Sequence, residues 1–277
     1  LDGVLDPRSP AYGGRERVPG AHDLRPLQPR LGGVAYVRRG AGPPLVLLHG
    51  NGHAWHEFEP VLDALAAGFD VVAWDMPGHG ASDDLAAPPT ITALAGALGD
   101  LIDDLSLSRP ALAGTSVGAM IALAAANARA DVRAVVLAEV QYRTRAWWDA
   151  AWPRVEQLFG QPVQTRDEIQ QRFVSPVADR VAQRWNADRA RVGATGLIAV
   201  MEAIRGFDVA SELRALRQPG LMLFGEAGPT VDMADAVRAD LPGLRIEVLP
   251  GAGHFLTVDQ PAAFARLVAE AVNGAGE

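Results

Sequence analysis

The chain has 277 residues, of which 49% are hydrophobic, so it can bury a large core in one domain that carries a small appendage. Its formal net charge of −8 provides no basic surface for phosphate groups, so we expect no nucleic-acid partner. Cysteine is absent, which excludes disulfides, thiolate metal sites and a cysteine nucleophile.

Residues 1–30 are rich in Pro, Gly and Arg and lack the apolar stretch of a signal peptide, so we expect an extended N-terminal segment there. No run reaches the roughly 20 apolar residues that a membrane helix needs. The most apolar region, 111–130, is interrupted by polar and charged side chains. The sequence therefore favours a cytoplasmic protein without a membrane span.

Two stretches, 34–38 and 45–48, are predicted strands joined by the Gly- and Pro-rich turn 40–44, which indicates a hairpin. After them, short β-branched runs alternate with Ala- and Leu-rich helical segments. These runs are 71–74, 111–113, 135–137, 221–224 and 246–249. The alternation predicts an α/β fold with a mostly parallel central sheet that is flanked by helices.

The alternation stops between residues 141 and 218, where helical patterns dominate and four of the six tryptophans occur. A crossover between parallel strands needs only about a dozen residues, and this segment is several times longer. We therefore predict a helical cap at 141–218, inserted into a core domain formed by 1–140 and 219–277.

A Gly-Thr-Ser-Val-Gly segment, 114–118, follows the predicted strand 111–113 and precedes an apolar helix. Small residues on both sides of a serine allow the sharp strand-to-helix turn that exposes a nucleophilic hydroxyl above a sheet. This context makes Ser116 the candidate nucleophile.

A serine hydroxyl needs a neighbouring base, and the chain offers six histidines. His254 follows the last predicted strand, at the carboxyl edge where open α/β sheets gather their active sites, and it is our candidate base. His49 suits a structural turn and His79 lies in a glycine-rich loop. The other histidines, His22, His53 and His56, are predicted to be surface or pocket-lining residues.

Backbone amides must stabilise the oxyanion that forms on the substrate. One is expected to be the amide of Val117, directly after the nucleophile. The second should come from the loop 49–52, where we favour the Asn51 amide because adjacent glycines allow close approach. Nothing in these motifs implies a metal or an organic cofactor.

These landmarks, together with the Leu-Leu-His-Gly segment that ends at Gly50 and the Asp-Met-Pro-Gly-His-Gly-Ala-Ser segment at 75–82, resemble the α/β-hydrolase superfamily over residues 34–272. The resemblance implies an α/β-hydrolase fold with a Ser-His-acid triad. Many members place the acid at the position of Gly228, so here it is absent or relocated. Glu139, after the strand 135–137, is our candidate; Glu226, Asp232 and a serine-histidine dyad remain open.

Within the superfamily, haloalkane dehalogenases use an aspartate nucleophile, which Ser116 replaces here. The zearalenone-type lactonases share a serine nucleophile, an Asp-Met-Pro-Gly segment like 75–78 and a Glu-Val pair like 139–140. Similarity to that group implies that a cap tryptophan contacts the substrate. Trp185 is the candidate counterpart.

The protein is expected to be a serine hydrolase that cleaves an ester or lactone of a small hydrophobic or aromatic compound through an acyl-enzyme. The most specific substrate that we predict is a zearalenone-like aromatic lactone. Two alternatives remain: carbon-carbon bond or amide hydrolysis on the same triad, and a receptor-like ligand-binding protein with weak hydrolysis. The sequence leaves the oligomeric state open, with a homodimer as one option.

Overall fold

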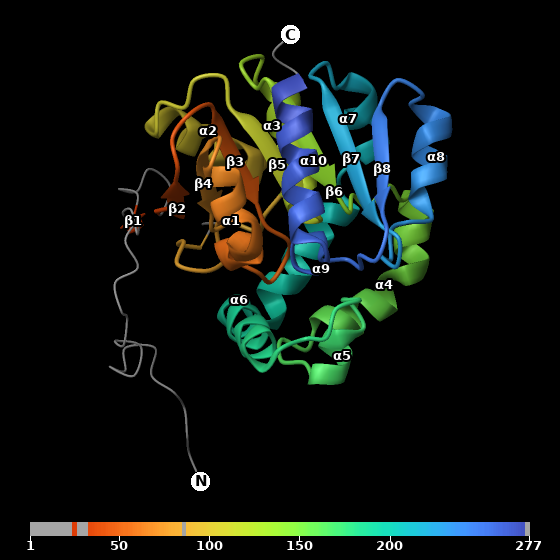
Figure 1. Cartoon of the computed structure of the whole chain (residues 1–277). Coiled ribbons are helices and arrows are strands. Elements are labelled where there is room, and N and C mark those ends of the chain that lie inside the picture. Colours follow the sequence, from red (N-terminus) through yellow and green to blue (C-terminus); the bar gives the residue numbers. More distant parts are fainter. Residues whose placement is uncertain (1–23, 27–32, 85–86, 275–277) are drawn as a thin grey trace.

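A computed structural model describes residues 24–26, 33–84 and 87–274 of the protein. At its centre is an eight-stranded sheet with the order β1-β2-β4-β3-β5-β6-β7-β8 (Figure 1). Strands β3 to β8 run parallel, whereas β1 pairs with β2 and β2 pairs with β4 in antiparallel fashion. The strands are β1 (Leu24–Pro26), β2 (Ala35–Arg39), β3 (Pro44–Leu48), β4 (Asp70–Trp74), β5 (Ala111–Thr115), β6 (Ala134–Ala138), β7 (Gly220–Gly225) and β8 (Arg245–Leu249).

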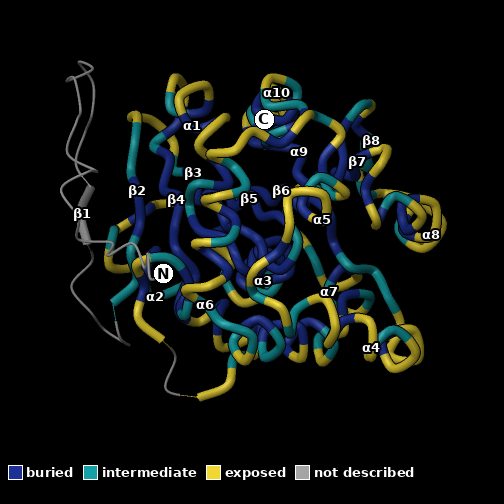
Figure 2. The backbone as a smooth tube through the Cα atoms, turned by 90° about the horizontal axis from the view of Figure 1, so that it is seen from below, coloured by how far each residue is buried: buried dark blue, intermediate teal, exposed yellow. Residues whose placement is uncertain are grey.

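Helices cover both faces of this sheet, which confirms the predicted α/β-hydrolase fold class. Every residue of β5 and β6 is buried, so these strands need apolar cover on both sides (Figure 2). One face is covered by α1 (Glu59–Ala66), α9 (Leu256–Asp259) and α10 (Pro261–Gly274), and the other by α2 (Ile91–Asp104), α3 (Val117–Ala128) and α7 (Val209–Ala215). Two smaller elements, η2 (Trp55–Phe58) and α8 (Met233–Asp240), complete this part of the chain.

The expected hairpin between the first two predicted strands is wrong. Strand β2 pairs with β4, and β3 lies between β4 and β5. Leu45, Val46, Leu47 and Leu48 of β3 are all completely buried. A strand buried on both faces takes a central place among parallel neighbours, which the turn at 40–44 could not reveal.

The N-terminal segment 1–30 lies outside the described residues, apart from 24–26. Those three residues form β1 at the edge of the sheet.

The segment 141–218 contains four helices and no strand: α4 (Arg145–Phe159), α5 (Arg166–Gln170), α6 (Asp179–Arg205) and α7. Helices α4, α5 and α6 lie below the carboxyl ends of the strands in Figure 1. Helix α7 instead contacts α3 of the sheet-covering layer. The backbone of α6 is interrupted at Gly193, whose φ of 71° and ψ of 164° are not helical. The division into a core and a cap stays a prediction.

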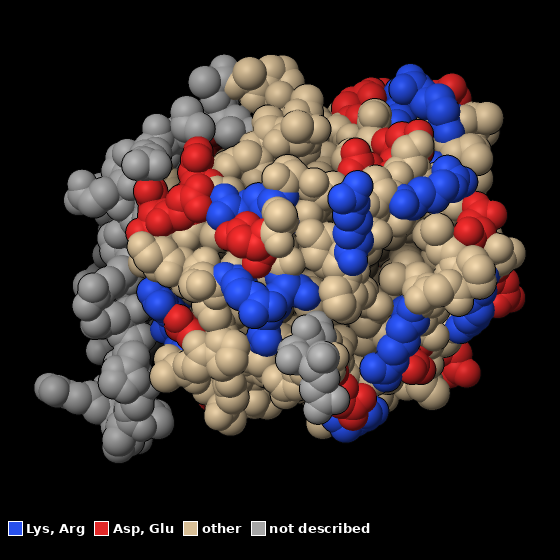
Figure 3. Space-filling model, turned by 90° about the horizontal axis from the view of Figure 1, so that it is seen from above, with Lys and Arg blue, Asp and Glu red and all other residues tan. Residues whose placement is uncertain are grey.

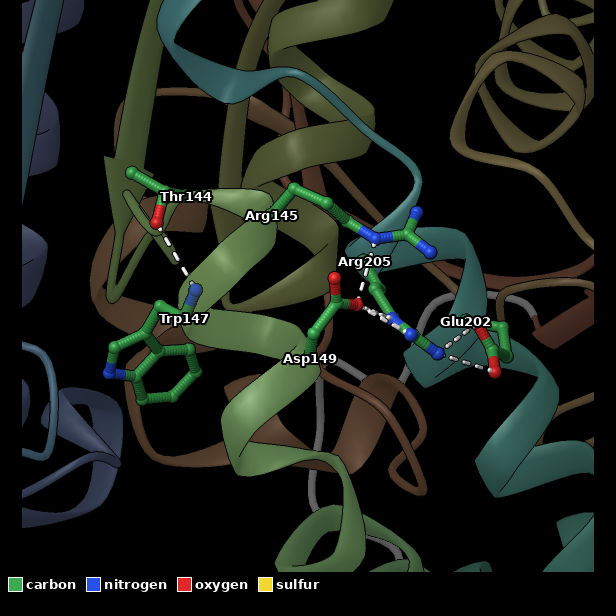
Figure 4. Close-up of polar contacts among 6 residues, drawn as sticks. All are labelled: Thr144, Arg145, Trp147, Asp149, Glu202 and Arg205. Carbon is green, nitrogen blue, oxygen red and sulfur yellow. Dashed lines mark hydrogen bonds and ion pairs between the residues drawn. The ribbon is translucent and has the colours of Figure 1, made fainter.

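A charged cluster joins α4 to the end of α6 (Figure 4). The Arg205 guanidinium donates to Asp149 at 2.6 Å and also contacts Glu202 at 3.2 Å, while Arg145 reaches the same Asp149 oxygen at 3.0 Å. The Thr144 hydroxyl accepts the Trp147 amide and so caps the start of α4. These contacts fix α4 and α6 relative to each other at the carboxyl ends of the strands.

Arginine and acidic side chains are interspersed over the face opposite α4, α5 and α6 (Figure 3). Many of the described arginines form ion pairs, such as Arg129 with Asp103 and Asp131. None of the described helices has the length and apolar character needed to cross a membrane.

Candidate active site

Ser116 occupies a strained turn between β5 and α3. Its φ of 52° and ψ of −119° are unfavourable for a residue with a side chain. A β-carbon at Gly114 would lie 2.3 Å from the Gly118 carbonyl carbon, and one at Gly118 would lie 2.0 Å from the Leu48 oxygen. Only glycine fits at either position, so the two glycines that flank Ser116 in the sequence motif have a steric cause. The Ser116 amide is held by the Ala138 carbonyl at 2.8 Å.

Val117 is the first residue of α3. The first amides of a helix have no acceptor within the helix, and they carry the positive end of its dipole. The Val117 amide is therefore suited to an anionic oxygen beside Ser116.

His254 and Glu139 contact each other across 115 residues of sequence. His254 Nδ1 lies 2.8 Å from Glu139 Oε2, which requires the proton on Nδ1 and leaves Nε2 as the free acceptor of the neutral ring. Glu139 is completely buried and has a φ of 56° directly after β6. Its carboxylate also accepts the Gly225 amide and the Thr230 hydroxyl, both at 2.7 Å. These bonds compensate the burial of its charge.

The two other candidate acids are engaged elsewhere. Glu226 accepts the Gly251 amide at 3.2 Å, and Asp232 forms an exposed ion pair with Arg143 at 2.8 Å. Gly228, where the family resemblance predicts the acid, adjoins the Glu139 carboxylate. The structure thus brings Glu139 to His254, and neither of the other two carboxylates is recorded in contact with that histidine.

The loop after β3 is held by the buried imidazole of His49. His49 Nε2 accepts the Met76 amide at 2.9 Å, so Nδ1 carries the proton and donates to the Gly50 carbonyl at 2.8 Å. Burial lowers the pKa of His49, which favours this neutral form. Since a peptide unit is planar and trans, fixing the Gly50 carbonyl also fixes the opposite direction of the Asn51 N–H.

The Asn51 side chain connects this loop to α6. Its Nδ2 donates to the Leu197 carbonyl at 2.9 Å, and its Oδ1 lies 3.3 Å from His79 Nε2. A β-carbon at Gly52 would lie 2.8 Å from a methyl carbon of Leu197, so glycine permits this approach. The loop expected to supply an oxyanion donor is therefore braced from both the sheet and α6.

Sequence analysis missed Glu57, a buried carboxylate behind Ser116. Its Oε2 accepts the Gly50 amide at 2.9 Å, and its Oε1 accepts the hydroxyl of Thr115. Burial raises the pKa of Glu57, while these two donors and the positive charge of a protonated His254 oppose the rise. A glutamate just before an amphipathic helix resembles an ordinary surface residue, so no sequence signal marked it.

Asp259 was also missed, and it organises the loop that carries His254. Its carboxylate accepts the Gly253 amide at 2.8 Å and the amides of Val174 and Ser175 at 3.0 Å and 2.8 Å. The loop after β8 is thereby tied to the segment between α5 and α6.

An aromatic cluster lies beside these groups, formed by Trp185 of α6 with His53, Phe173 and Phe255. The His53 ring centroid lies 4.5 Å from that of Trp185 and 4.9 Å from that of Phe255. Trp185 is buried, and its Nε1 donates to Gln164 at 2.9 Å. A β-carbon at Gly50 would lie 3.7 Å from His53 and 3.5 Å from the Ser116 β-carbon. His53 is therefore the member of the cluster that lies near Gly50, as does the Ser116 β-carbon.

Burial lowers the pKa of His53 well below its ordinary value. His56, stacked on Trp55 with ring centroids 4.0 Å apart, has its pKa lowered to about 4 for the same reason. Both imidazoles are neutral near pH 7. Within the described residues, no group of three His, Asp or Glu side chains is arranged to hold a metal ion.

The alpha/beta hydrolase family model matches residues 45–267, and the chain belongs to this family. A similar curated protein is the (E)-2-((N-methylformamido)methylene)succinate hydrolase of Acinetobacter baylyi, 29% identical over 199 residues, which cover 70% of this chain and 76% of the relative. The pimeloyl-[acyl-carrier protein] methyl ester esterase of Neisseria meningitidis is 30% identical over 243 residues, covering 82% of this chain and 93% of the relative.

Among solved structures, the enol-lactonase from Burkholderia xenovorans superimposes with a TM-score of 0.73 at 23% identity. The match covers 87% of this chain and 97% of the lactonase. At that identity the similarity supports the fold alone.

Proposed function

We propose that the protein is a serine hydrolase that cleaves a carboxylic ester or lactone, with Ser116 as nucleophile, His254 as general base and Glu139 as the acid that orients the histidine. The observation that carries the proposal is the 2.8 Å contact between His254 Nδ1 and the buried Glu139, on the same sheet edge as the strained turn at Ser116. It leaves Nε2 free to accept a proton.

In the proposed reaction, Ser116 Oγ attacks the substrate carbonyl carbon while His254 Nε2 takes the hydroxyl proton. The carbonyl oxygen becomes an oxyanion, which the amides of Val117 and Asn51 stabilise. Collapse of this intermediate breaks the ester bond, and the leaving alkoxide receives the proton from His254. Water, activated by the same nitrogen, then attacks the acyl-enzyme and releases the acid and the free serine.

The aromatic cluster around Trp185 supports a small hydrophobic substrate, with an aromatic lactone of the zearalenone type as the specific candidate. Apolar walls with a few polar groups favour such ligands. The names of the esterase from Neisseria meningitidis and the lactonase from Burkholderia xenovorans agree with ester or lactone cleavage.

Amide hydrolysis is the second candidate. The relative from Acinetobacter baylyi acts on a compound that contains a formamido group. The same nucleophile and oxyanion donors serve ester and amide cleavage, because both pass through a tetrahedral intermediate.

The test is hydrolysis of a short aryl ester, a long-chain ester, a macrocyclic aromatic lactone and the matching aryl amide, with Ser116→Ala as the blank. We expect ester or lactone turnover that Ser116→Ala abolishes. Preference for the aryl amide would favour the second candidate. Turnover that survives in Ser116→Ala would refute the proposed nucleophile, and stoichiometric acylation of Ser116 without turnover would indicate a receptor-like protein.

A further inference from the structure

Arg172 lies between α5 and α6, next to the loop that carries His254. Its carbonyl accepts the His254 amide at 3.0 Å. A β-carbon at Gly253 would lie 2.6 Å from that carbonyl oxygen, so glycine permits the close approach. The backbone of Arg172 is therefore fixed relative to His254.

The Arg172 guanidinium has neither a carboxylate nor a hydrogen-bond acceptor among the residues that the structure describes. Its recorded contact is with the Trp185 ring, whose centroid lies 5.6 Å from the guanidinium carbon. Burial is the sole cause acting on the pKa of Arg172, and it lowers that pKa because no opposite charge counters it.

Another arginine nearby, Arg189, finds three acceptors in the protein. The Arg189 guanidinium donates to the carbonyls of Leu158, Gln161 and Pro162. Among the described residues, no carbonyl accepts a hydrogen bond from the Arg172 guanidinium. Arg172 is half-buried, and its guanidinium nitrogens are not completely buried, so a ligand can reach them.

The Trp185 ring that Arg172 contacts belongs to the aromatic cluster, which extends toward Ser116 through His53. Trp185 contacts His53, and His53 approaches the Gly50 position beside the Ser116 β-carbon. The positive charge of Arg172 also contributes to lowering the pKa of His53, which places the two groups in one electrostatic environment. Arg172 thus contacts one member of the aromatic cluster, and another member, His53, approaches the proposed nucleophile.

A partly buried charge without a partner is costly, and an arginine fork matches a carboxylate through two parallel hydrogen bonds. We propose that Arg172 binds a carboxylate of the substrate while the aromatic cluster packs on the apolar segment between that carboxylate and the cleaved carbonyl. The substrate is then a monoester of a dicarboxylic acid, or a lactone with a free carboxylate. This inference rests on the proposed function and specifies its substrate class.

The kinetic test compares two esters of equal chain length, mono-para-nitrophenyl adipate and para-nitrophenyl hexanoate. We expect wild-type kcat/KM to favour the anionic ester by about tenfold to a hundredfold, the factor that a charged hydrogen-bonded pair supplies. Arg172→Met keeps the aliphatic stem and should lose this preference through a higher KM for the adipate ester, with a much smaller effect on kcat/KM for the hexanoate. Arg172→Lys should keep part of the preference.

Arg154→Met is the matched control, because it removes an exposed positive charge from α4. It should leave the preference for the anionic ester unchanged. Equal wild-type use of the two esters, or an equal loss on both in Arg172→Met, would overturn the proposal.

Two further measurements separate this inference from the proposed function and from a merely structural role. Calorimetry on the Ser116→Ala variant should detect binding of monoethyl adipate but not of ethyl hexanoate. The double variant Ser116→Ala with Arg172→Met should not bind monoethyl adipate. Arg172-dependent binding without turnover in wild type would keep this inference and reject the proposed hydrolase. Turnover of both esters without such binding would support the proposed hydrolase and reject the role of Arg172.

The Tm of Arg172→Met should equal or exceed that of wild type, since removing a partly buried charge that has no partner costs little stability. A lower Tm would indicate a structural role for Arg172.

Discussion

A side chain at Gly228 and the carboxylate of Glu139 would occupy the same space. A β-carbon built on Gly228 lies 2.9 Å from both Glu139 oxygens, closer than real β-carbons approach other atoms. The resemblance to the α/β-hydrolase superfamily predicts an acid at the Gly228 position, whereas here the Glu139 carboxylate, which follows β6, fills that space. The space beside the loop at 228 therefore accommodates one acidic side chain, from position 139 or from position 228.

Removing Glu139 should lower turnover strongly. We expect Glu139→Gly to reduce kcat by about a hundredfold to ten-thousandfold, because the histidine loses the partner that fixes its tautomer and stabilises its charged form. Glycine also relieves the φ of 56° at this position, which limits the loss of stability. Steady-state kinetics on the preferred ester measures the effect. Glu226→Ala, which removes an exposed carboxylate, is the control and should behave as wild type.

Moving the acid should restore part of this loss. In the double variant Glu139→Gly with Gly228→Asp, the aspartate enters the vacated space beside His254, and we expect kcat to rise about tenfold above the single Glu139→Gly variant. The single Gly228→Asp variant should be inactive or unstable, because two carboxylates then meet in one buried site. Equal kcat in the double variant and in Glu139→Gly would show that the two positions are not equivalent.

Glu57 should act through position, because its bonds join the Gly50 amide to the residue before Ser116. Glu57→Gln keeps the size but offers an NH₂ group to one of the two donors, so we expect kcat to fall about tenfold with little change in KM. Glu57→Ala leaves both donors unpaired and should also lower the free energy of unfolding by about 2 kcal/mol or more. Glu59→Gln, on the exposed side of α1, provides the comparison. A loss confined to KM would contradict a positioning role.

Adding one methyl group at Gly118 or at Gly96 should separate the steric effect of a new β-carbon on stability from its conformational effect. The new β-carbon of Gly118→Ala would lie 2.0 Å from the Leu48 oxygen, so we expect lower stability by about 1–3 kcal/mol together with loss of activity. Gly96→Ala, exposed in α2 with no atom within 4 Å, should instead raise stability by about 1 kcal/mol. Urea unfolding of both variants checks the pair, and similar destabilisation in both would refute the steric explanation.

Stability should depend on pH through Asp188 of α6. Burial raises its pKa to about 7 in the folded protein, against an ordinary value of 3.8. Between these pH values the unfolded chain releases the proton while the folded protein keeps it, so stability falls as pH rises from about 4 to 7. We expect Asp188→Asn to match wild type near pH 4 and to exceed it above pH 7 by a few kcal/mol, roughly 4 at most. Urea unfolding at both pH values measures this, and a constant difference would contradict the assignment.

The sequence by itself determined the features that depend on a few neighbouring residues. The parallel strands after residue 70 follow from short apolar runs, and the turn at Ser116 follows from two glycines whose β-carbons would collide with the backbone. His254 was placed at the carboxyl edge because it directly follows the last strand. Local sterics and periodicity are present in the sequence itself, so these predictions needed no knowledge of distant contacts.

Only the tertiary structure decided how distant segments meet. Strand β2 pairs with β4 rather than with β3, the next strand in the sequence, and the turn at 40–44 does not predict this pairing. Glu139, Glu226 and Asp232 are all carboxylates, and the fold brings Glu139 into contact with His254 while the other two bond elsewhere. Glu57 looks like a surface residue until burial removes its water, and Arg172 does so until packing leaves it partly buried without a partner. Both effects depend on the packing of the whole chain.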